Sequence, residues 1–174
     1  TWAAILKRVK NSKLILNSTC FNNTKLKDRY IKKFHDQGIE SHRLDFYYES
    51  PPWDSMRQID IALDCFPHNS GTTLIEYIYM GTPFINYSNR PSVGRIGASI
   101  LTTLGRPEWI TFSEQEYIEK AVSLATNTKK LAKIRGTLRE EMETSPLMDQ
   151  KGFVCELEKT YQNMWDKWCA KYME

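Results

Sequence analysis

Two hydrophobic periods alternate along the first two thirds of the chain. Short apolar or alternating runs, which are typical of strands, lie at residues 13–17, 43–48, 59–63, 84–87 and 108–110. Apolar residues that recur every three or four positions, as on one face of a helix, lie at residues 2–10, 24–37, 53–58, 71–80 and 93–104. Strands that alternate with helices favour a parallel sheet covered by helices. We therefore predict an α/β fold with a doubly wound, Rossmann-like sheet.

Beyond residue 113 the pattern is helical throughout. Ser113 and Glu116 form a capping box, and two further helical stripes follow it. The last stripe is rich in aromatic side chains, and its members are Phe153, Leu157, Tyr161, Met164 and Trp168. Buried aromatic side chains are a common core element, so we expect this stripe to be core. The prediction is one domain over residues 1–174, in which helices of residues 113–174 pack on the sheet.

The composition limits the class of protein. The chain has 174 residues, of which 41% are hydrophobic and 26% charged, which is typical of a single globular domain. A net charge of +3, from 24 basic and 21 acidic residues, is too balanced to indicate a nucleic-acid partner. No apolar run approaches the roughly 20 residues of a membrane span, so no membrane partner is expected.

The cysteines indicate neither a metal site nor disulfides. Cys20, Cys65, Cys155 and Cys169 form no C-x-x-C pair and have no histidine at a metal-ligand spacing, which indicates free thiols. With no signal-peptide pattern, the expected location is the cytoplasm. The chain opens on Thr1 within a helical pattern, so we expect that further sequence precedes it.

The most informative stretch is the polar turn that follows the strand at residues 59–63. Asn69, Ser70, Gly71, Thr72 and Thr73 stand between that strand and the next helix. The free N–H groups of a helix start attract anions, and this position is a ligand site in doubly wound sheets. Gly71 allows close backbone approach, and the two threonines can donate both N–H and O–H groups to phosphate oxygens.

Glu76 lies one helical turn beyond this pair, three residues after Thr73 and four after Thr72. From there its carboxylate could accept hydrogen bonds from a ribose diol. Helix capping alone also enriches serine and threonine at such a position, and a solvated Glu76 needs no ligand. Ligand binding and capping therefore both account for the motif.

The segment from Asp60 to Pro83, with Asn69, Thr72-Thr73 and Glu76, resembles the C-terminal catalytic half of the O-linked N-acetylglucosaminyltransferases, including the SPINDLY-type relatives. The resemblance continues through residues 95–99, 104–105, 145–147 and 156–165, and it runs in order from Ile5 to about Trp168. It implies a GT-B glycosyltransferase that transfers N-acetylglucosamine from UDP to Ser or Thr hydroxyls, with inversion and without a metal or other cofactor. Thr72 and Thr73 then correspond to the residues that bind the donor pyrophosphate, and Glu76 to an acidic residue on the uridine ribose.

The chain departs from the family at two positions, and a third residue, Arg95, has two interpretations. Family members commonly carry histidine before the Thr-Thr pair, where this chain has Gly71; His68 either takes over that contact or is a polar surface residue. The uracil-stacking histidine of the family has no counterpart, and Trp53 either stacks on uracil instead or belongs to the core. Arg95, at the start of the next helix, either approaches the phosphates or is solvated.

The resemblance also implies what this chain lacks. The family's catalytic lysine lies before the helix at residue 2, and the catalytic base and acceptor-binding tetratricopeptide repeats belong to the N-terminal half. We therefore expect no catalytic residue in this chain and no turnover from the chain alone. Two rival interpretations stay open: a related transferase with another sugar or an Asn acceptor, and a non-catalytic interaction module on a degenerate transferase fold.

Overall fold

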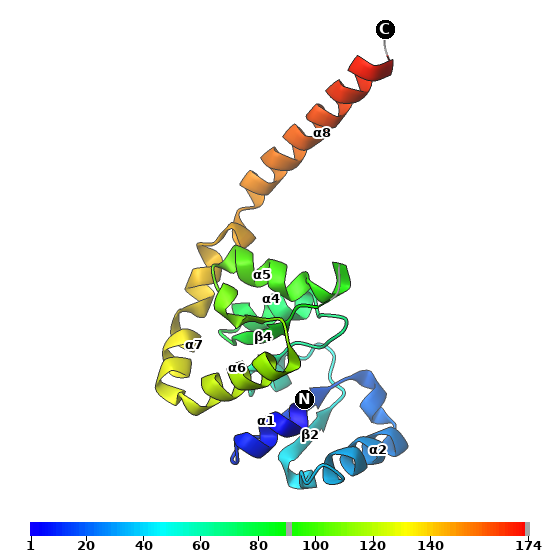
Figure 1. Ribbon diagram of the computed structural model, residues 1–174, viewed down its shortest axis with the longest axis vertical. Coiled ribbons are helices and arrows are strands. Elements are labelled where there is room, and N and C mark those ends of the chain that lie inside the picture. Colours follow the sequence, from blue (N-terminus) through cyan, green and yellow to red (C-terminus); the bar gives the residue numbers. More distant parts are fainter. Residues whose placement is uncertain (90–91, 173–174) are drawn as a thin grey trace.

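A computed structural model describes residues 1–89 and 92–172 of the chain (Figure 1). Its α-helices are α1 (Trp2–Arg8), α2 (Thr24–His35), α3 (Trp53–Met56), α4 (Thr72–Tyr79), α5 (Ile96–Leu104), α6 (Glu114–Thr126), α7 (Thr128–Glu143) and α8 (Gln150–Tyr172). Its strands are β1 (Leu14–Asn17), β2 (Leu44–Tyr47), β3 (Ala62–Leu63), β4 (Phe84–Tyr87) and β5 (Ile110–Thr111). Short 3-10 turns η1 (Thr19–Asn22), η2 (Ser41–Arg43), η3 (Ser92–Gly94), η4 (Pro107–Trp109) and η5 (Pro146–Met148) join them.

All strand pairs are parallel, as the alternation of strands and helices predicts. β1 pairs with β2 from Leu14 opposite Leu44, and β4 lies between β3 and β5 in a second ladder. α4 and α5 lie on one face of β4 and α6 on the other, which gives three layers (Figure 1). The α/β class is therefore confirmed, although the hydrogen-bonded ladders form two sheets where we predict one.

The predicted strand at residues 59–63 is shorter than expected for a physical reason. The carbonyl oxygen of Ile59 accepts hydrogen bonds from the Thr82 hydroxyl at 3.1 Å and from the Arg135 guanidinium at 2.7 Å. Arg135 also donates to the Asp60 carbonyl at 3.2 Å. Because side chains occupy these carbonyls, the ladder with β4 begins only at Ala62.

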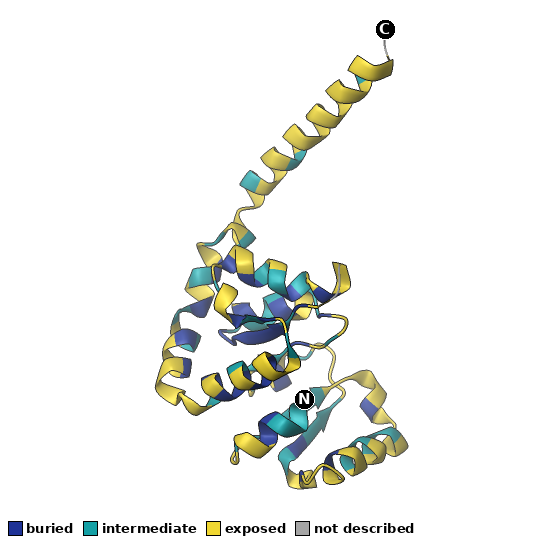
Figure 2. Cartoon of the chain, in the orientation of Figure 1, coloured by how far each residue is buried: buried dark blue, intermediate teal, exposed yellow. Residues whose placement is uncertain are grey.

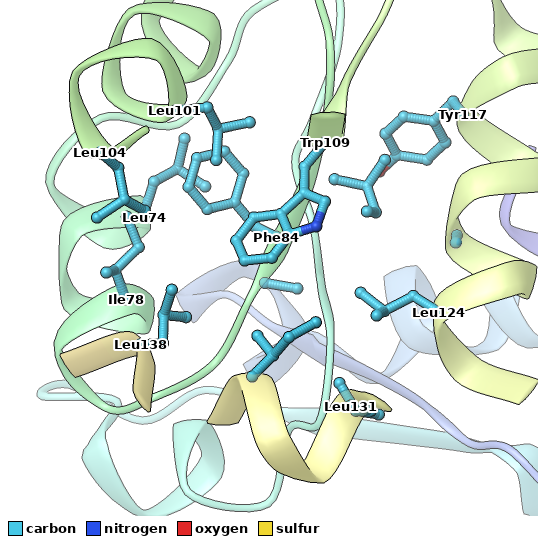
Figure 3. Packing of buried hydrophobic residues seen from close by; sticks show 14 of the residues in the cluster. Leu74, Ile78, Phe84, Leu101, Leu104, Trp109, Tyr117, Leu124, Leu131 and Leu138 are labelled. Atoms are coloured by element: carbon cyan, nitrogen blue, oxygen red, sulfur yellow. The ribbon is translucent and has the colours of Figure 1, made fainter. Parts of the chain in front are cut away.

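The larger of two buried clusters surrounds β4. Phe84 is fully buried between Leu74 and Ile78 of α4, Leu101 of α5 and residues of α6 and α7, and Trp109 packs beside it (Figure 3). A smaller cluster lies between β1, β2 and α2. α1 joins the two, because Ile5 is buried in the larger cluster and its neighbour Leu6 in the smaller one.

The long helix α8 does not pack on the sheet. It projects from the rest of the chain after η5, and none of its described residues is buried (Figures 1 and 2). Phe153, Tyr161, Met164 and Trp168 of the aromatic stripe are all about half exposed or more. The expectation that this stripe is core is therefore wrong, because helical periodicity shows that a face is apolar but not what covers it.

Two further observations concern the composition. Among residues 1–89 and 92–172, no helix combines the length and the apolarity that a membrane span needs. All four cysteines are free thiols, as their spacing predicts.

Candidate functional site

Two loops meet at the carboxyl edge of the second sheet. Residues 64–71 connect β3 to α4, and residues 88–95 connect β4 to α5. Because β3 and β4 are neighbouring parallel strands, both loops leave the sheet at the same edge. The backbone N–H of Asn69 donates to the Val93 carbonyl at 2.8 Å, which ties the first loop to the second. This edge therefore brings the start of α4 close to the start of α5.

A cluster of buried polar side chains lies beneath the first loop. Asp64, Asn69 and Asn86 are each at most 2% exposed. The Asn86 Nδ2 group donates to Asp64 Oδ2 at 2.8 Å and to Asn69 Oδ1 at 3.0 Å. Asn86 thus links the end of β3 to the loop from its place within β4.

The same cluster fixes the loop backbone. Asp64 Oδ1 accepts from the Ser70 N–H at 2.8 Å, and Asn69 Nδ2 donates to the Cys65 carbonyl at 2.9 Å. From the opposite face, the Tyr117 hydroxyl of α6 donates to the Asp64 carbonyl at 2.9 Å. The loop between Cys65 and Ser70 is therefore held by hydrogen bonds from two layers of the fold.

Burial has a strong effect on Asp64. Loss of solvent raises the pKa of its carboxyl from 3.8 to about 6, although hydrogen bonds from the Ser70 backbone and from Asn86 oppose the rise. The carboxyl is close to the helix start at which an anion would bind. Its negative charge at neutral pH is accordingly stabilised by hydrogen-bond donors from the loop and from β4.

The structure corrects the expected role of Asn69. We predict that this residue contacts a ligand, but its side chain is 2% exposed and both of its polar atoms are already hydrogen-bonded. It turns inward because Asn86 and the Cys65 carbonyl offer it complementary partners. Asn69 therefore shapes the turn instead of lining its surface.

The two threonines face solvent and do not cap the helix. The N-cap of α4 is Gly71, which has no side chain to supply a cap, and Thr72 and Thr73 are exposed. Among the described residues, neither their hydroxyl groups nor their backbone N–H groups have a hydrogen-bond partner. Open space surrounds Gly71, where an added Cβ would meet no atom within 4 Å. The capping interpretation of this Thr pair therefore finds no support.

The charged candidates around the turn are accessible. His68 and Arg95 are exposed, and Glu76 is partly exposed. Arg95 is the N-cap residue of α5, so it lies on the second of the two joined loops. Within residues 1–89 and 92–172, none of these three side chains forms an ion pair or a hydrogen bond with another protein group. They are thus available to a ligand at this edge.

Trp53 comes from another part of the fold. It is the first residue of α3, the helix that follows β2 of the first sheet, and its side chain is 43% exposed. The alternative that Trp53 belongs to the core is therefore wrong, and no hydrogen bond or ring contact joins it to the turn in the described part of the chain.

Two residues of this site, Asp64 and Asn86, are not among the candidates predicted from the sequence. The sequence does contain a signal for each, since Asp64 follows the apolar end of a predicted strand and Asn86 interrupts an otherwise apolar strand. Polar side chains at such positions are buried with a partner. Their pairing across 22 residues becomes visible only in three dimensions.

Other features lie away from this edge. A shallow hollow of about 540 Å³ is lined by residues of α2 and of the turn after it, and it includes none of the candidate residues. In the described ranges, no group of three or more His, Cys, Asp or Glu side chains is placed to hold a metal ion. The arrangement of the edge suits an anion with hydrogen-bonding groups, since α4 begins with unpaired N–H and O–H donors and the loop tied to it carries the exposed Arg95.

The fold and this polar edge define a doubly wound α/β domain of the class that takes ligands where the carboxyl ends of the strands meet. The family model for glycosyl transferase family 41 matches residues 1–157. The chain therefore belongs to glycosyl transferase family 41.

Relatives and a solved structure agree with this assignment. The chain is 33% identical over 172 residues to the probable UDP-N-acetylglucosamine–peptide N-acetylglucosaminyltransferase SPINDLY of Arabidopsis thaliana. This match covers 97% of this chain and 19% of the relative. It is 31% identical to the SEC protein of the same plant, which has the same enzyme name, over 98% of this chain and 18% of the relative. A mutant O-GlcNAc transferase of Thermobaculum terrenum superposes with a TM-score of 0.88 at 29% identity, over 98% of this chain and 33% of that one. The chain thus spans about one fifth of the length of the two plant relatives and one third of the solved chain, and the predicted GT-B-type α/β fold is confirmed.

Proposed function

We propose that this chain is the donor-binding half of an inverting, metal-independent protein O-glycosyltransferase that uses UDP-N-acetylglucosamine and modifies Ser or Thr hydroxyls. The observation that carries the proposal is the unpaired set of donors on Thr72 and Thr73, at a helix start that a buried polar cluster holds in place. The names of the relatives support the donor and the peptide acceptor. The catalytic base and the acceptor site then belong to the part of such enzymes that this chain does not contain.

The roles of the exposed residues follow from their chemistry. The N–H and O–H groups of Thr72 and Thr73 donate to the donor pyrophosphate, and Arg95 adds positive charge from α5. Glu76 accepts from the ribose hydroxyls one helical turn further along. Donors that are oriented before the reaction stabilise the negative charge that grows on the UDP leaving group. His68 flanks the phosphates, and Trp53 stacks on the uracil ring.

The direct test is UDP binding followed by amide resonances. UDP at millimolar concentration should shift the resonances of residues 71–76, and the double substitution Thr72→Ala/Thr73→Ala should weaken UDP binding on the order of 10- to 100-fold, because charge-assisted hydrogen bonds are lost. The matched control is Thr102→Ala/Thr103→Ala, which removes two neighbouring exposed threonines whose hydroxyls bond only to the backbone of α5. Unshifted resonances at residues 71–76 in the unsubstituted chain would count against the donor site.

The identity of the sugar and the acceptor has a separate test. A related transferase with another sugar or an Asn acceptor would share this half of the fold, since the residues that contact sugar and acceptor lie elsewhere. Turnover of the full polypeptide with a panel of UDP- and GDP-sugars separates these activities. Transfer from another nucleotide sugar, with none from UDP-N-acetylglucosamine, would replace the donor named here.

One observation favours a second candidate function, a non-catalytic interaction module. Gly71 stands where the resembling enzymes commonly carry histidine, and His68 lies three residues away in the chain. If Thr72→Ala/Thr73→Ala leaves the turnover of the full polypeptide unchanged, the donor assignment fails. If the full polypeptide shows no turnover with any donor, the module interpretation gains support.

A further inference from the structure

The buried pair Asp64–Asn86 has no direct access to a ligand, yet it determines the shape of the turn that carries the donor groups. Both side chains are almost fully buried, at 1% and 0% exposure. Asn86 Nδ2 makes two hydrogen bonds at once, to Asp64 Oδ2 and to Asn69 Oδ1. It is therefore the common point between the strand end and the loop.

The connection to the helix start is short. Asp64 Oδ1 holds the Ser70 N–H at 2.8 Å, and Ser70 is followed by Gly71 and the two threonines. Asn69, held from below by Asn86, donates its own N–H to Val93 on the loop that leads to Arg95. Displacement of Asn86 would thus release both the α4 start and its link to the second loop.

The fold is built closely around this pair. An added Cβ at Gly97, in the first turn of α5, would lie 2.5 Å from Asn86 Nδ2 and 2.7 Å from Asp64 Oδ2. The backbone of α5 therefore lies directly against the two side chains. The Oδ1 atom of Asn86 has no hydrogen-bond partner within the described residues. The side chain is held in one orientation by its Nδ2 contacts, although this leaves a buried acceptor unpaired.

We propose that Asp64 and Asn86 are positioning residues for donor binding, which hold the turn of Asn69–Gly71 so that Thr72 and Thr73 present their donors to a pyrophosphate. This inference rests on the proposed function, because it assigns a role toward the same ligand. The pair acts through the turn and does not touch the donor. Its loss should therefore weaken recognition of the phosphates more than recognition of the nucleoside.

The ratio of UDP affinity to uridine affinity measures this role. Calorimetric titration of the protein with each ligand gives the ratio, and general loss of folded protein lowers both affinities together without changing it. Asn86→Leu removes the Nδ2 donor at similar volume and without a change in charge. We expect this variant to lower the ratio about tenfold, the effect of losing about 1.4 kcal/mol of phosphate-specific binding.

Asp64→Asn is the second variant. It removes a buried charge, so we expect it to fold even if Asn86→Leu does not. An amide at position 64 has only one acceptor oxygen, so it cannot accept from both the Ser70 N–H and the Asn86 Nδ2 group as the carboxylate does. Loss of the negative charge alone would favour pyrophosphate binding. A lower ratio in this variant therefore reports lost positioning, and an unchanged or higher ratio would overturn the inference.

Thr82→Val is the matched control. Thr82 is fully buried and hydrogen-bonded like Asn86, but it precedes β4 and so lies at the opposite edge of the sheet. Its ratio should stay within about twofold of that of the unsubstituted protein. An equal loss in all three variants would show that the pair is merely structural. If the unsubstituted protein binds UDP no better than uridine, the proposed donor site itself is refuted. If the unsubstituted protein prefers UDP and the variants at positions 64 and 86 keep that preference, only the positioning role is refuted.

Discussion

Substitution of Gly97 by alanine should destabilise the domain at the point where α5 meets the polar cluster. The new Cβ would lie 2.5 Å from Asn86 Nδ2 and 2.7 Å from Asp64 Oδ2, whereas ordinary contacts of this kind begin near 3.4 Å. Either α5 moves away from β4 by nearly 1 Å or the Asp64–Asn86 hydrogen bond breaks. Both responses disturb a region in which the neighbouring side chains are almost fully buried.

The size of the effect follows from these two responses. Overpacking of a tight site costs about 1–3 kcal/mol, and a buried polar group left without its partner costs a similar amount. The free energy of unfolding of Gly97→Ala should therefore fall by about 1–3 kcal/mol, whichever of the two responses occurs. For a chain of this length, such a change lowers the Tm by roughly 2–12 °C.

Gly136→Ala is the control, since it makes the same chemical change in the opposite setting. Gly136 is an exposed residue in the middle of α7, and an added Cβ there meets no atom within 4 Å. Alanine in a helix interior is more favourable than glycine by about 0.5–1 kcal/mol, so this variant should be slightly more stable. Thermal and urea unfolding of the three proteins provide the assay. If Gly97→Ala is as stable as the unsubstituted chain, the close packing of α5 on the Asp64–Asn86 pair is wrong.

Three shorter predictions follow from burial and charge. Leu138→Ala, on the buried face of α7, should lower the free energy of unfolding by about 2–5 kcal/mol in urea titrations, whereas Trp168→Ala on the exposed α8 should change it by less than about 0.5 kcal/mol. A large loss for Trp168→Ala would show that α8 packs within this chain. The pKa of Asp64 is raised on folding from 3.8 to about 6, so the native state binds its proton more tightly and the contribution of Asp64 to stability falls as the pH rises from about 4 to about 6. The difference in unfolding free energy between Asp64→Asn and the unsubstituted chain should change over this range by about 3 kcal/mol in favour of the variant, and a difference that is flat with pH would contradict the burial of this charge. Arg106→Ala removes the guanidinium that donates to both carboxylate oxygens of Glu141 at 2.6 and 2.7 Å, and should lower the Tm by a few degrees, with Arg139→Ala, which loses an exposed ion pair, as the weaker comparison.

Local sequence signals predict the elements of the fold well, because each rests on a short-range cause. The run 84–87 is strand β4 with the predicted bounds, and the helix expected over 71–80 is α4 at Thr72–Tyr79. Gly105 ends α5 in a left-handed conformation, as a glycine after the last apolar helical position predicts. These features depend on periodicity and on backbone preference, both of which can be read from a few neighbouring residues.

The errors lie where distant residues decide the outcome. The strand at 59–63 shortens because Arg135, 76 residues beyond Ile59, takes its carbonyl oxygen. The aromatic stripe of α8 satisfies the helical period but has no covering element in the described chain. At the candidate site, the sequence places the Thr pair and Glu76 on one helix face, but it does not show that Asn69 turns inward to meet Asn86.

The energetic cost of burying the Asp64 carboxylate also bears on the site as a whole. At neutral pH the charged carboxylate is almost excluded from solvent, and the rise of its pKa to about 6 corresponds to a loss of stability of about 3 kcal/mol. An apolar residue of similar size would avoid this cost, but it could not hold the Ser70 N–H or orient Asn86 toward Asn69. A carboxylate beneath the turn that we propose binds the donor is therefore best understood as the part that shapes the turn, because neither stability nor attraction to a phosphate accounts for its presence. It also follows that the same substitution, Asp64→Asn, should raise stability at neutral pH while it lowers selectivity for UDP over uridine, and a variant that changes both properties in the same direction would refute this explanation.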